Sequence, residues 1–322
     1  AKTPFPFDVQ PLSFINKNPE VNFSFYNPSI IGSLDNSKYY VAVREASFNY
    51  CPNHVHDRPQ DFSRIHLGIA DNPIGPAKFC STFNEGSRRR RFKGPQDPRL
   101  MYITPHGSKT KSLHMMFFND WTIHLSQVHF SESKSGCSAK VTNRLRLWVN
   151  DTQRMQKNWM LIPDRTTQDG QPLFAYKFNP LEVLRVNMTS GEGVVISSQP
   201  QLKCVPGIRG SSMFLHHPTE PNVFIGIVHE QLRGRRYYSR VISIKEYEPL
   251  KFKVTGISDR FGIPQNNETP CVDRIHFTPS IFYPDKTNKS IVITMGYMDC
   301  TIHTIQVKTT DFLSSIKPID CS

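Results

Sequence analysis

Several features that mark common classes of protein are missing from this sequence of 322 residues. It has no apolar run of roughly 18 residues, so no segment is predicted to cross a membrane as a helix. Its seven cysteines form no Cys-x-x-Cys pair, which argues against a structural zinc site. It also has no Asp-x-Asp motif, no Gly-x-Ser-x-Gly elbow and no P-loop. We therefore expect no catalytic metal and none of the chemistry that these motifs support.

Helical patterning is also scarce. The 25 prolines and 17 glycines interrupt the chain too often for apolar residues to keep a helical spacing over several turns. Runs typical of β-strands are frequent, and turn residues separate them. The composition, 38% hydrophobic and 20% charged, is that of a folded globular protein, so we predict an all-β fold. The predicted strands include residues 39–43, 65–69, 113–118, 223–228 and 290–295.

A repeated pattern organises these strands. A polar residue before Pro, or a Gly-Ser pair, leads into a short apolar strand, and a polar turn then leads into a second one. Five such openings lie roughly 50 to 70 residues apart, which predicts a five-bladed β-propeller that forms a single domain. We assign residues 25–322 to the propeller and residues 1–24 to an N-terminal extension; a large β-sandwich or jelly roll is the alternative. The openings are residues 27–30, 97–100, 158–161, 210–214 and 278–282.

The net charge of +12 comes with two dense basic clusters, at residues 88–93 and 233–240. Neither cluster is a long basic helix, and neither has zinc-finger spacing or the aromatic signature of an RNA-binding module. Solvated loop charge is the simplest interpretation. A small anionic ligand such as a phosphate or a sugar nucleotide is the next, because arginine pairs with phosphate in a bidentate manner. Nucleic acid ranks last.

Charged side chains recur where the repeated strands begin or end. In a propeller the inner strands of the blades line one channel, so equivalent strand ends meet at one mouth. A ring of charged groups there suits a polyhydroxylated ligand, which needs many donors and acceptors. Trp121 and Trp159 lie beside these ends, where they could stack on a sugar ring or pack between blades. The charged residues are Arg44, Asp97, Asp120, Lys177, Arg209, His229, Glu230 and Asp299.

Cysteine and asparagine usage bears on the compartment. Seven cysteines and five Asn-x-Ser/Thr sequons favour a secretory compartment, either the Golgi lumen or the cell exterior, with two or three disulfides and one odd thiol. The alternative is a cytosolic protein with free buried cysteines. The chain opens on Ala1 without an initiator Met or a signal peptide, so we expect a processed or truncated start, with room for a membrane anchor in a longer form. The sequons start at Asn22, Asn150, Asn187, Asn267 and Asn288.

Four blade motifs resemble a known family. Residues 27–28, 41–44, 94–99 and 296–299, in this order, resemble the five-bladed propeller enzymes of glycoside hydrolase family 130, which are β-mannoside phosphorylases and hydrolases. They also resemble glycosyltransferase family 108, whose members are mannosyltransferases and phosphorylases that act on β-1,2-mannan. The resemblance spans about residues 25–310.

The middle of the chain resembles eukaryotic glycosyltransferases of the same propeller type, with fungal β-mannosyltransferases as one possible kin. This second resemblance is carried by residues 157–160, 174–180, 207–212 and 229–230. The arginine-rich channel of such a carbohydrate-type propeller favours transfer of a sugar to a glycan over its cleavage.

The resemblance assigns roles to individual residues. It makes Asp97 the catalytic acid of an acidic-Asp-Pro-Arg motif, although Gln96 stands where the family usually has Glu. It implies that Arg99 binds sugar or phosphate and that Asp299 lies near the sugar. An inverting reaction needs one group for the leaving-group or acceptor proton and room for a nucleophile on the opposite face. Asp97 would supply the former, directly or through a sugar hydroxyl; its alternative role is an Asp-Pro turn that caps a strand.

The other site residues follow from the charges that such a reaction needs. Arg44, Arg99, Arg209 and His229 would hold phosphate or a nucleoside diphosphate. Asp120 and Asp299 would hold sugar hydroxyls, while Trp121, Lys177 and Glu230 complete the substrate-binding set.

Three functions remain open from the sequence. The leading hypothesis is a glycosyltransferase that moves mannose or a similar sugar from an activated phosphate donor to a glycan acceptor. It needs a sugar nucleotide or sugar phosphate as co-substrate and no cofactor. The second is a secreted glycoside hydrolase or phosphorylase, and the third is an inactive glycan-binding propeller. Nucleic acid is not expected as a partner.

Overall fold

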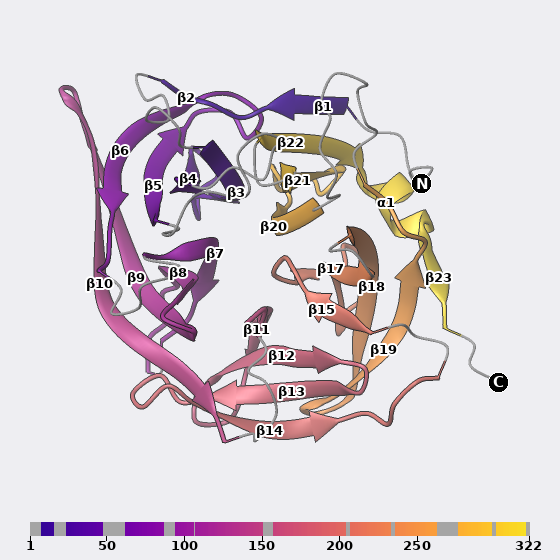
Figure 1. Ribbon diagram of the computed structural model, residues 1–322. Coiled ribbons are helices and arrows are strands. Elements are labelled where there is room, and N and C mark those ends of the chain that lie inside the picture. Colours follow the sequence, from indigo (N-terminus) through magenta and orange to yellow (C-terminus); the bar gives the residue numbers. More distant parts are fainter. Residues whose placement is uncertain are drawn as a thin grey trace.

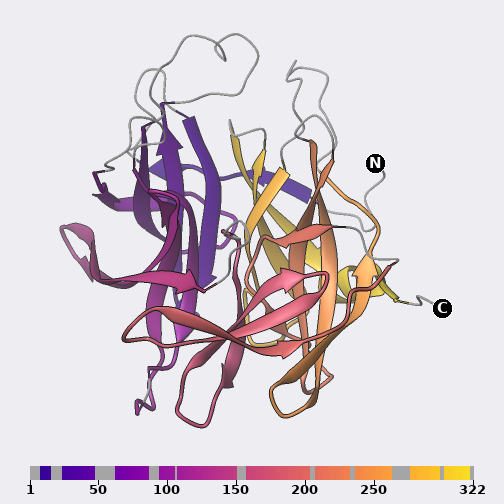
Figure 2. The same ribbon diagram turned by 60° about the horizontal axis from the view of Figure 1, so that its bottom comes forward.

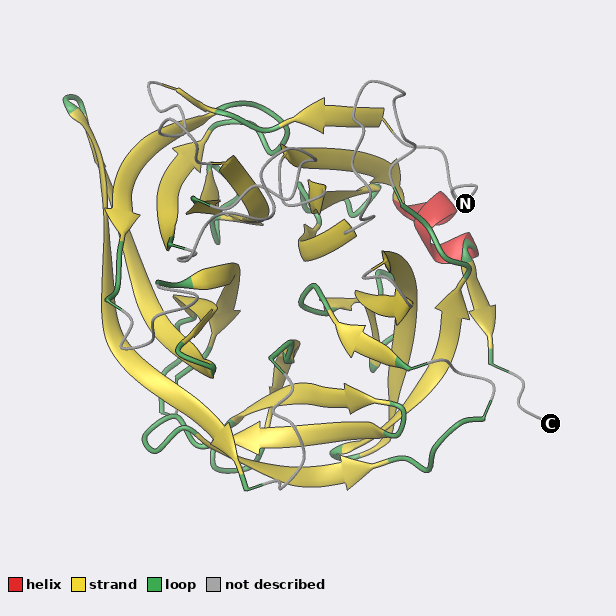
Figure 3. Ribbon diagram, in the orientation of Figure 1, coloured by secondary structure: helices red, strands yellow, loops and turns green. Residues whose placement is uncertain are grey.

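The computed structural model describes residues 8–15, 24–47, 62–86, 94–105, 107–150, 157–203, 207–232, 236–262, 276–297 and 301–319. These residues are almost entirely β-structure, as predicted, and their only helix is the short α1 (Thr309–Ser314) (Figure 3). That helix is far too short to span a bilayer, and the described residues hold no other helix that could. The predicted strand runs fall in β4 (Tyr39–Ala46), β5 (Ser63–Ala70), β8 (Ser112–Asn119), β17 (Val223–Leu232) and β21 (Ser290–Tyr297).

The strands form a β-propeller around a central axis (Figure 1). Each blade is an antiparallel sheet that runs from an inner to an outer strand. The described strands group into five blades, two of which are joined edge to edge in one eight-stranded sheet. The first blade contains β3 (Ser24–Gly32), β4 (Tyr39–Ala46), β5 (Ser63–Ala70) and β6 (Ala77–Phe83). The second contains β7 (Gln96–Ile103), β8 (Ser112–Asn119), β9 (Thr122–Ser133) and β10 (Gly136–Val149).

The remaining blades follow in chain order. The third contains β11 (Met160–Thr166), β12 (Pro172–Phe178), β13 (Leu181–Val186) and β14 (Glu192–Ser198). The fourth contains β15 (Ile208–Gly210) and β16 (Leu215–His216) on the inside, then β17 (Val223–Leu232), β18 (Arg236–Glu248) and β19 (Lys251–Ser258). The fifth contains β20 (His276–Phe282), β21 (Ser290–Tyr297) and β22 (Thr301–Lys308).

Strands from the chain ends complete two outer edges. Strand β1 (Asp8–Pro11) pairs with β22 in antiparallel register, with Val9 opposite Ile305, so it is the outer strand of the fifth blade. Strand β2 (Phe14–Ile15) runs parallel to β6 of the first blade. The segment that we assigned to an N-terminal extension therefore contributes to two blades. At the other end, β23 (Ile316–Pro318) pairs with β19.

The second and third blades are joined at their outer edges. The long β9–β10 hairpin reaches beyond the ring (Figures 1 and 2), and the end of β10 pairs in parallel with β14 through Trp148 and Val149. A disulfide between Cys80 of β6 and Cys137 of β10 links the first and second blades. It is the disulfide of the described residues. The other five cysteines, on which the predicted further disulfides and the odd thiol depend, lie outside them.

The repeated X-Pro openings have one structural cause. In β3, β7 and β20 the ladder to the next strand slips across residues 27–28, 97–98 and 278–279. Each slip is a β-bulge. Proline is tolerated in a bulge because the ladder needs no hydrogen bond from the backbone nitrogen at that position. Asn27 and Asp97 adopt positive φ values of 52° and 51°, a conformation that Asn and Asp accept more readily than other side chains. The sequence repeat thus marks the same bulge at the same level of different blades.

The residue after the bulge ties neighbouring inner strands together. Ser29 accepts a hydrogen bond from the backbone N–H of Leu100 (2.8 Å), and Ser280 accepts one from that of Ile30 (2.9 Å). At the equivalent place in β7 stands Arg99 rather than a serine. Ser29 and Ser280 thus form a buried hydroxyl belt around the channel, in which Arg99 takes the place of a third serine.

Candidate active site

Two equivalent bulges bring Asn27 and Asp97 together. Asn27 Nδ2 donates a hydrogen bond to Asp97 Oδ1 at 2.7 Å, and both side chains are buried. The bulge and the positive φ displace each side chain from the regular alternation of its strand, which lets the two meet across adjacent blades. Asp97 is therefore held in place by its counterpart in the first blade.

Two cations complete the surroundings of Asp97. Arg44 Nη1 lies 3.3 Å from Oδ1, and Lys157 Nζ lies 3.2 Å from Oδ2. Arg44 is fixed by a 2.9 Å hydrogen bond from its Nε to Ser63 Oγ, and its guanidinium lies 4.5 Å from the centre of the Tyr26 ring. The Lys157 side chain is 45% exposed, whereas those of Arg44 and Asp97 are each 8% exposed. Lys157 is thus the partner that can leave Asp97 at small cost.

These partners set the charge of Asp97. Burial on its own would raise the pKa of this carboxyl group. Lys157, Arg44 and Arg99, with the hydrogen bond from Asn27, outweigh burial and hold the pKa of Asp97 below its usual range. Asp97 is therefore ionised at neutral pH in the free protein.

Arg99, two residues after Asp97, is a buried cation with contacts in three other blades. It is 2% exposed, and its Nε donates to the carbonyl oxygen of Ser211 while its Nη2 donates to Asn158 Oδ1, both at 2.7 Å. The guanidinium carbon lies 5.2 Å from the centre of the Phe277 ring. Burial lowers the pKa of Arg99 to about 10, with Asp97 opposing the shift, so the side chain keeps its charge. One residue of β7 thus braces the third, fourth and fifth blades.

His229 lines the same mouth from the fourth blade. It is 2% exposed, packs against the rings of Tyr237 and Phe277, and its Nδ1 has no hydrogen-bond partner among the described residues. Burial, followed by the positive charges of Arg209, Arg99 and Lys157, lowers its pKa to about 3. His229 is therefore neutral at pH 7, and its buried Nδ1 has hydrogen-bonding capacity that no described residue uses.

Two aromatic rings, of Phe118 and Trp121, lie near Lys157. Lys157 Nζ lies 5.3 Å from the centre of the Phe118 ring, and Trp121 meets that ring edge-on at 6.3 Å. Trp121 is 54% exposed and shares with Asp120 the turn between β8 and β9, where both have positive φ. An exposed indole beside a polar mouth is suited to stacking on a sugar ring.

Three of the residues singled out in the sequence have partners within the blades. Lys177 forms an ion pair with Glu182 of the adjacent strand at 3.1 Å. Glu230 accepts hydrogen bonds from Arg240 (2.9 Å) and Arg260 (2.6 Å) within its own blade. Trp159 is buried between blades, with its ring edge against Tyr176, so it has the packing role.

One predicted site residue is exposed, and another lies outside the described residues. Arg209 is exposed and stands opposite His229 in the β15–β17 ladder. Asp299, the first basic cluster at residues 88–93 and residues 233–235 of the second cluster lie outside the described residues.

The sequence analysis missed Asn27, Lys157 and Asn158 as site residues. The signal for Asn27 was its identical setting before proline, shared with Asp97. Lys157 and Asn158 precede β11 and carry no such mark, because only the ring arrangement brings them to Asp97 and Arg99.

The donor set does not resemble a metal centre. No group of three or more His, Cys, Asp or Glu side chains in the described part of the chain is arranged to hold a metal ion. Asp97 is surrounded by cations, which would repel one. The same cations, with the neutral His229 and the Trp121 ring, suit a sugar that carries or meets a phosphate.

Comparisons with known proteins bear on the fold. No protein-family model matches the sequence, and no curated protein matches it. Among solved structures, β-1,2-mannobiose phosphorylase from Listeria innocua, in complex with β-1,2-mannobiose, is 9% identical, with 93% of this chain and 94% of that chain covered and a TM-score of 0.59. A glycosyl hydrolase from Bacteroides ovatus is 11% identical, with 92% and 86% covered and a TM-score of 0.57.

A third similar structure is MPT-4, a mannose phosphorylase from Leishmania mexicana in complex with a phosphate ion. It is 11% identical, with 98% of this chain and 93% of that chain covered and a TM-score of 0.51. At these identities the likeness shows a shared fold. It confirms the propeller part of the predicted resemblance.

Proposed function

We propose that this protein is a carbohydrate-active enzyme that cleaves β-mannoside-like glycans at the mouth occupied by Asp97, by phosphorolysis or by hydrolysis. The observation that carries the proposal is the buried Asp97 carboxylate, which Asn27 positions and Arg44 and Lys157 flank. A propeller shared with a mannobiose phosphorylase and a mannose phosphorylase supports it.

This proposal reverses the order of the sequence hypotheses. The sequence favoured a glycosyltransferase and kept cleavage as the alternative. The structures described above as similar are named as glycoside hydrolases and phosphorylases, which favours the alternative. Transfer from a sugar nucleotide becomes an outcome of the assay below.

Phosphorolysis accounts best for the charges near Asp97. An inverting hydrolase uses a second carboxylate to activate water, whereas a phosphorylase uses phosphate as the nucleophile. The described groups that touch Asp97 are two cations and an amide. A phosphate nucleophile needs no second carboxylate, and cations hold it in place.

Phosphate would also change the protonation of Asp97. In the free protein Lys157 and Arg44 keep this carboxylate ionised, whereas an acid catalyst must carry a proton. When phosphate binds the half-exposed Lys157, the carboxylate loses its outermost cation and gains a negative neighbour. Both changes raise the pKa of Asp97. Binding of the nucleophile thus prepares Asp97 to hand a proton to the leaving group, directly or through a sugar hydroxyl.

The remaining mouth residues would hold the sugar and the phosphate. Trp121 would stack on a ring, His229 Nδ1 would accept or donate one hydrogen bond, and Arg209 would add positive charge for the phosphate. Asp120 and Asp299 keep their proposed role at sugar hydroxyls. Lys177 and Glu230 brace the blades around the mouth through their ion pairs. No cofactor is needed beyond phosphate as co-substrate.

We also propose that the chain works in the secretory pathway or outside the cell. The Cys80–Cys137 disulfide supports this, because such bonds persist in oxidising compartments. The sequon residue Asn150 is exposed after β10, and Asn187 directly precedes a turn, where a glycan could be attached. A mobility shift on reduction and another after endoglycosidase treatment of the secreted protein would test it; absence of both shifts would place the chain in a reducing compartment.

The test of the activity is a product analysis with and without phosphate. The protein is incubated with β-linked mannobioses, and mannose and mannose 1-phosphate are measured. Mannose 1-phosphate that forms only with phosphate establishes phosphorolysis, and mannose formed without it establishes hydrolysis. Product that forms only from a nucleotide-activated mannose would overturn the proposal in favour of transfer. Glycan binding without any product would indicate a lectin.

The matched control is a carboxylate far from the mouth. Asp97→Asn should abolish product, whereas Asp71→Asn should not, because Asp71 is an exposed residue whose ion pair with Lys38 lies at the surface. Full turnover by Asp97→Asn would remove the assigned role of Asp97.

A further inference from the structure

The central channel has a second mouth, at the opposite end from Asp97. The inner strands all enter their blades in the same direction, with the bulges and Asp97 near their starts. Their far ends enclose a cavity of about 470 Å³. This volume is within the range of roughly 300–1,000 Å³ that is typical of small-molecule sites.

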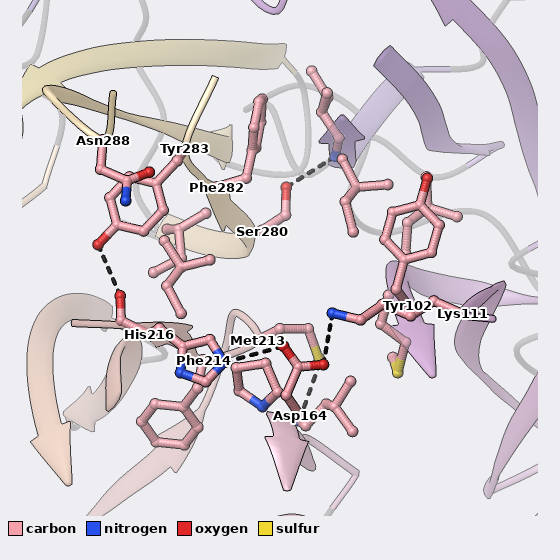
Figure 4. A pocket seen from close by; sticks show the side chains of 18 of the residues that line it. Tyr102, Lys111, Asp164, Met213, Phe214, His216, Ser280, Phe282, Tyr283 and Asn288 are labelled. Carbon is pink, nitrogen blue, oxygen red and sulfur yellow. Dashed lines mark hydrogen bonds and ion pairs between the residues drawn. The ribbon is translucent and has the colours of Figure 1, made fainter. Parts of the chain in front are cut away.

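The walls of this cavity are apolar. Every blade's inner segment contributes a side chain, and Figure 4 shows aromatic rings and methionines facing the same space. Such walls favour an apolar ligand body because they release water when it enters. The walls include Ile30, Leu100, Met101, Leu161, Met213 and Phe282.

The rim of the cavity carries a polar group of three side chains. Asp164 lies between Lys111, whose Nζ is 2.6 Å from Oδ1, and His216, whose Nε2 is 3.2 Å from Oδ2 (Figure 4). Tyr283 donates from its hydroxyl to the carbonyl oxygen of His216 at 2.9 Å. Asn288 adds an amide to the lining. Hydrogen-bonding groups therefore gather on one side of an otherwise apolar space.

The charges of the lining cancel. Lys111 and Asp164 are its charged residues, and they pair with each other. The hydrogen bond from His216 and the charge of Lys111 keep the pKa of Asp164 below its usual range despite burial, so the carboxylate stays ionised and paired. Because the two charges already satisfy each other, the lining offers no net charge to an ionic ligand. A charged group placed among the apolar walls would lack a partner, which is costly.

The cavity is separate from the candidate active site. Ser280 of the hydroxyl belt lines the inner end of the cavity, whereas Arg99 and Ser29 do not line it. None of the described residues that contact Asp97 lines the cavity. Leu100 follows Arg99 directly but contributes to the opposite end.

We propose that this cavity is a binding site for a neutral amphipathic small molecule. The molecule's apolar chain or ring lies against Leu100, Met101 and Phe282, and its hydroxyl or amide group bonds at the Lys111–Asp164–His216 rim. The site takes its ligand independently of the activity proposed for the Asp97 mouth.

The test compares three probes of equal chain length by calorimetry at pH 7. We expect 1-octanol to bind saturably with one site per chain, with a negative heat-capacity change from apolar burial. Octanoate and octylammonium should each bind at least about fivefold more weakly. Tighter binding of either ion, or no saturable binding of 1-octanol, would overturn the proposal.

Variants locate the binding. Leu215 is a half-buried lining residue, and Leu215→Trp should fill part of the cavity and weaken 1-octanol at least about tenfold. Val195→Trp adds the same bulk at a 43% exposed position on β14 and should leave binding unchanged. Equal binding by both variants would place the site elsewhere. Asp97→Asn should bind 1-octanol like the unmodified protein, which separates this test from that of the activity.

A second measurement needs no variant. Crystals of the unmodified protein under xenon pressure should show xenon between Met101 and Phe282, since xenon enters apolar cavities of this kind. Crystals without xenon there would count against the site, even if Leu215→Trp failed to fold.

Discussion

Asn27 and Asp97 are counterparts in adjacent blades, and they are joined by a hydrogen bond of 2.7 Å. Both precede a proline, both lie in a β-bulge of an inner strand, and both have positive φ. One carries an amide and the other a carboxylate, so the repeated backbone supplies a donor in one blade and an acceptor in the next. The two blades thus repeat the same backbone conformation but place different side chains on it.

The first prediction concerns Asn27. Asn27→Ala should destabilise the fold by about 1–3 kcal/mol, because alanine tolerates positive φ poorly and the bond to Asp97 is lost. Asn27→Gly loses the same bond but accepts the backbone conformation, so it should be the more stable of the two. Urea unfolding measures both. Equal stabilities would show that backbone conformation at residue 27 is of no consequence.

The second prediction concerns Lys157. Lys157→Gln should raise the KM for phosphate about tenfold, since an exposed cation that contacts phosphate contributes about 1–2 kcal/mol to its binding. Its effect on stability should stay within about 1 kcal/mol, because the side chain is 45% exposed. Lys251→Gln is the control, since that lysine pairs with Glu248 at the surface. A phosphate KM that Lys157→Gln leaves unchanged would put phosphate elsewhere.

The third prediction is a pH dependence of stability that comes from His229. Its pKa is about 3 in the folded protein and about 6.5 in an unfolded chain, so the unfolded state binds more protons between these values. Stability from the neutral imidazole is therefore complete above about pH 6.5 and declines as the pH falls towards 3. The slope approaches 1.4 kcal/mol per pH unit.

His229→Asn isolates this contribution, because other histidines also titrate. The variant should lose less stability than the unmodified protein when urea unfolding is compared at pH 7, 5 and 4. Parallel losses in the two proteins would show that His229 is not the group responsible.

The fourth prediction compares two tryptophans. Trp121→Ala should raise the KM for a glycan about tenfold and leave stability almost unchanged, because the ring is 54% exposed. Trp159→Ala should cost about 3–5 kcal/mol, because that ring is buried between blades. Thermal unfolding and glycan kinetics on both variants decide. A large stability loss in Trp121→Ala would instead make it a packing residue.

The fifth prediction concerns the Cys80–Cys137 disulfide. It closes a loop with a sequence separation of 57 residues, for which chain entropy predicts roughly 4 kcal/mol. Replacing both cysteines by alanine should therefore lower the free energy of unfolding by about 2–4 kcal/mol and leave kinetics at the Asp97 mouth unchanged. A loss of activity in a folded double variant would mean that the first and second blades shift relative to each other without it.

Part of the site was predictable because it repeats. The X-Pro openings revealed the inner strands, and with them the level at which Asp97 and Arg99 lie. The same repeat could not show that Arg99 reaches past its own blade to Ser211 and Asn158, because that contact depends on the width of the channel. Nor could it separate Glu230, which two arginines of its own blade hold, from His229, the next residue along.

The sequence by itself determined the all-β class and the five repeats, because strand patterning and proline-marked bulges are local properties of the chain. Only the tertiary structure decided which side chains surround the Asp97 carboxylate. Asn27, Arg44 and Lys157 are 70, 53 and 60 residues away from it, and closure of the ring brings them within hydrogen-bonding distance. The charge of Asp97 is consequently a property of the assembled ring, since burial and the neighbouring cations exist only after the blades have packed.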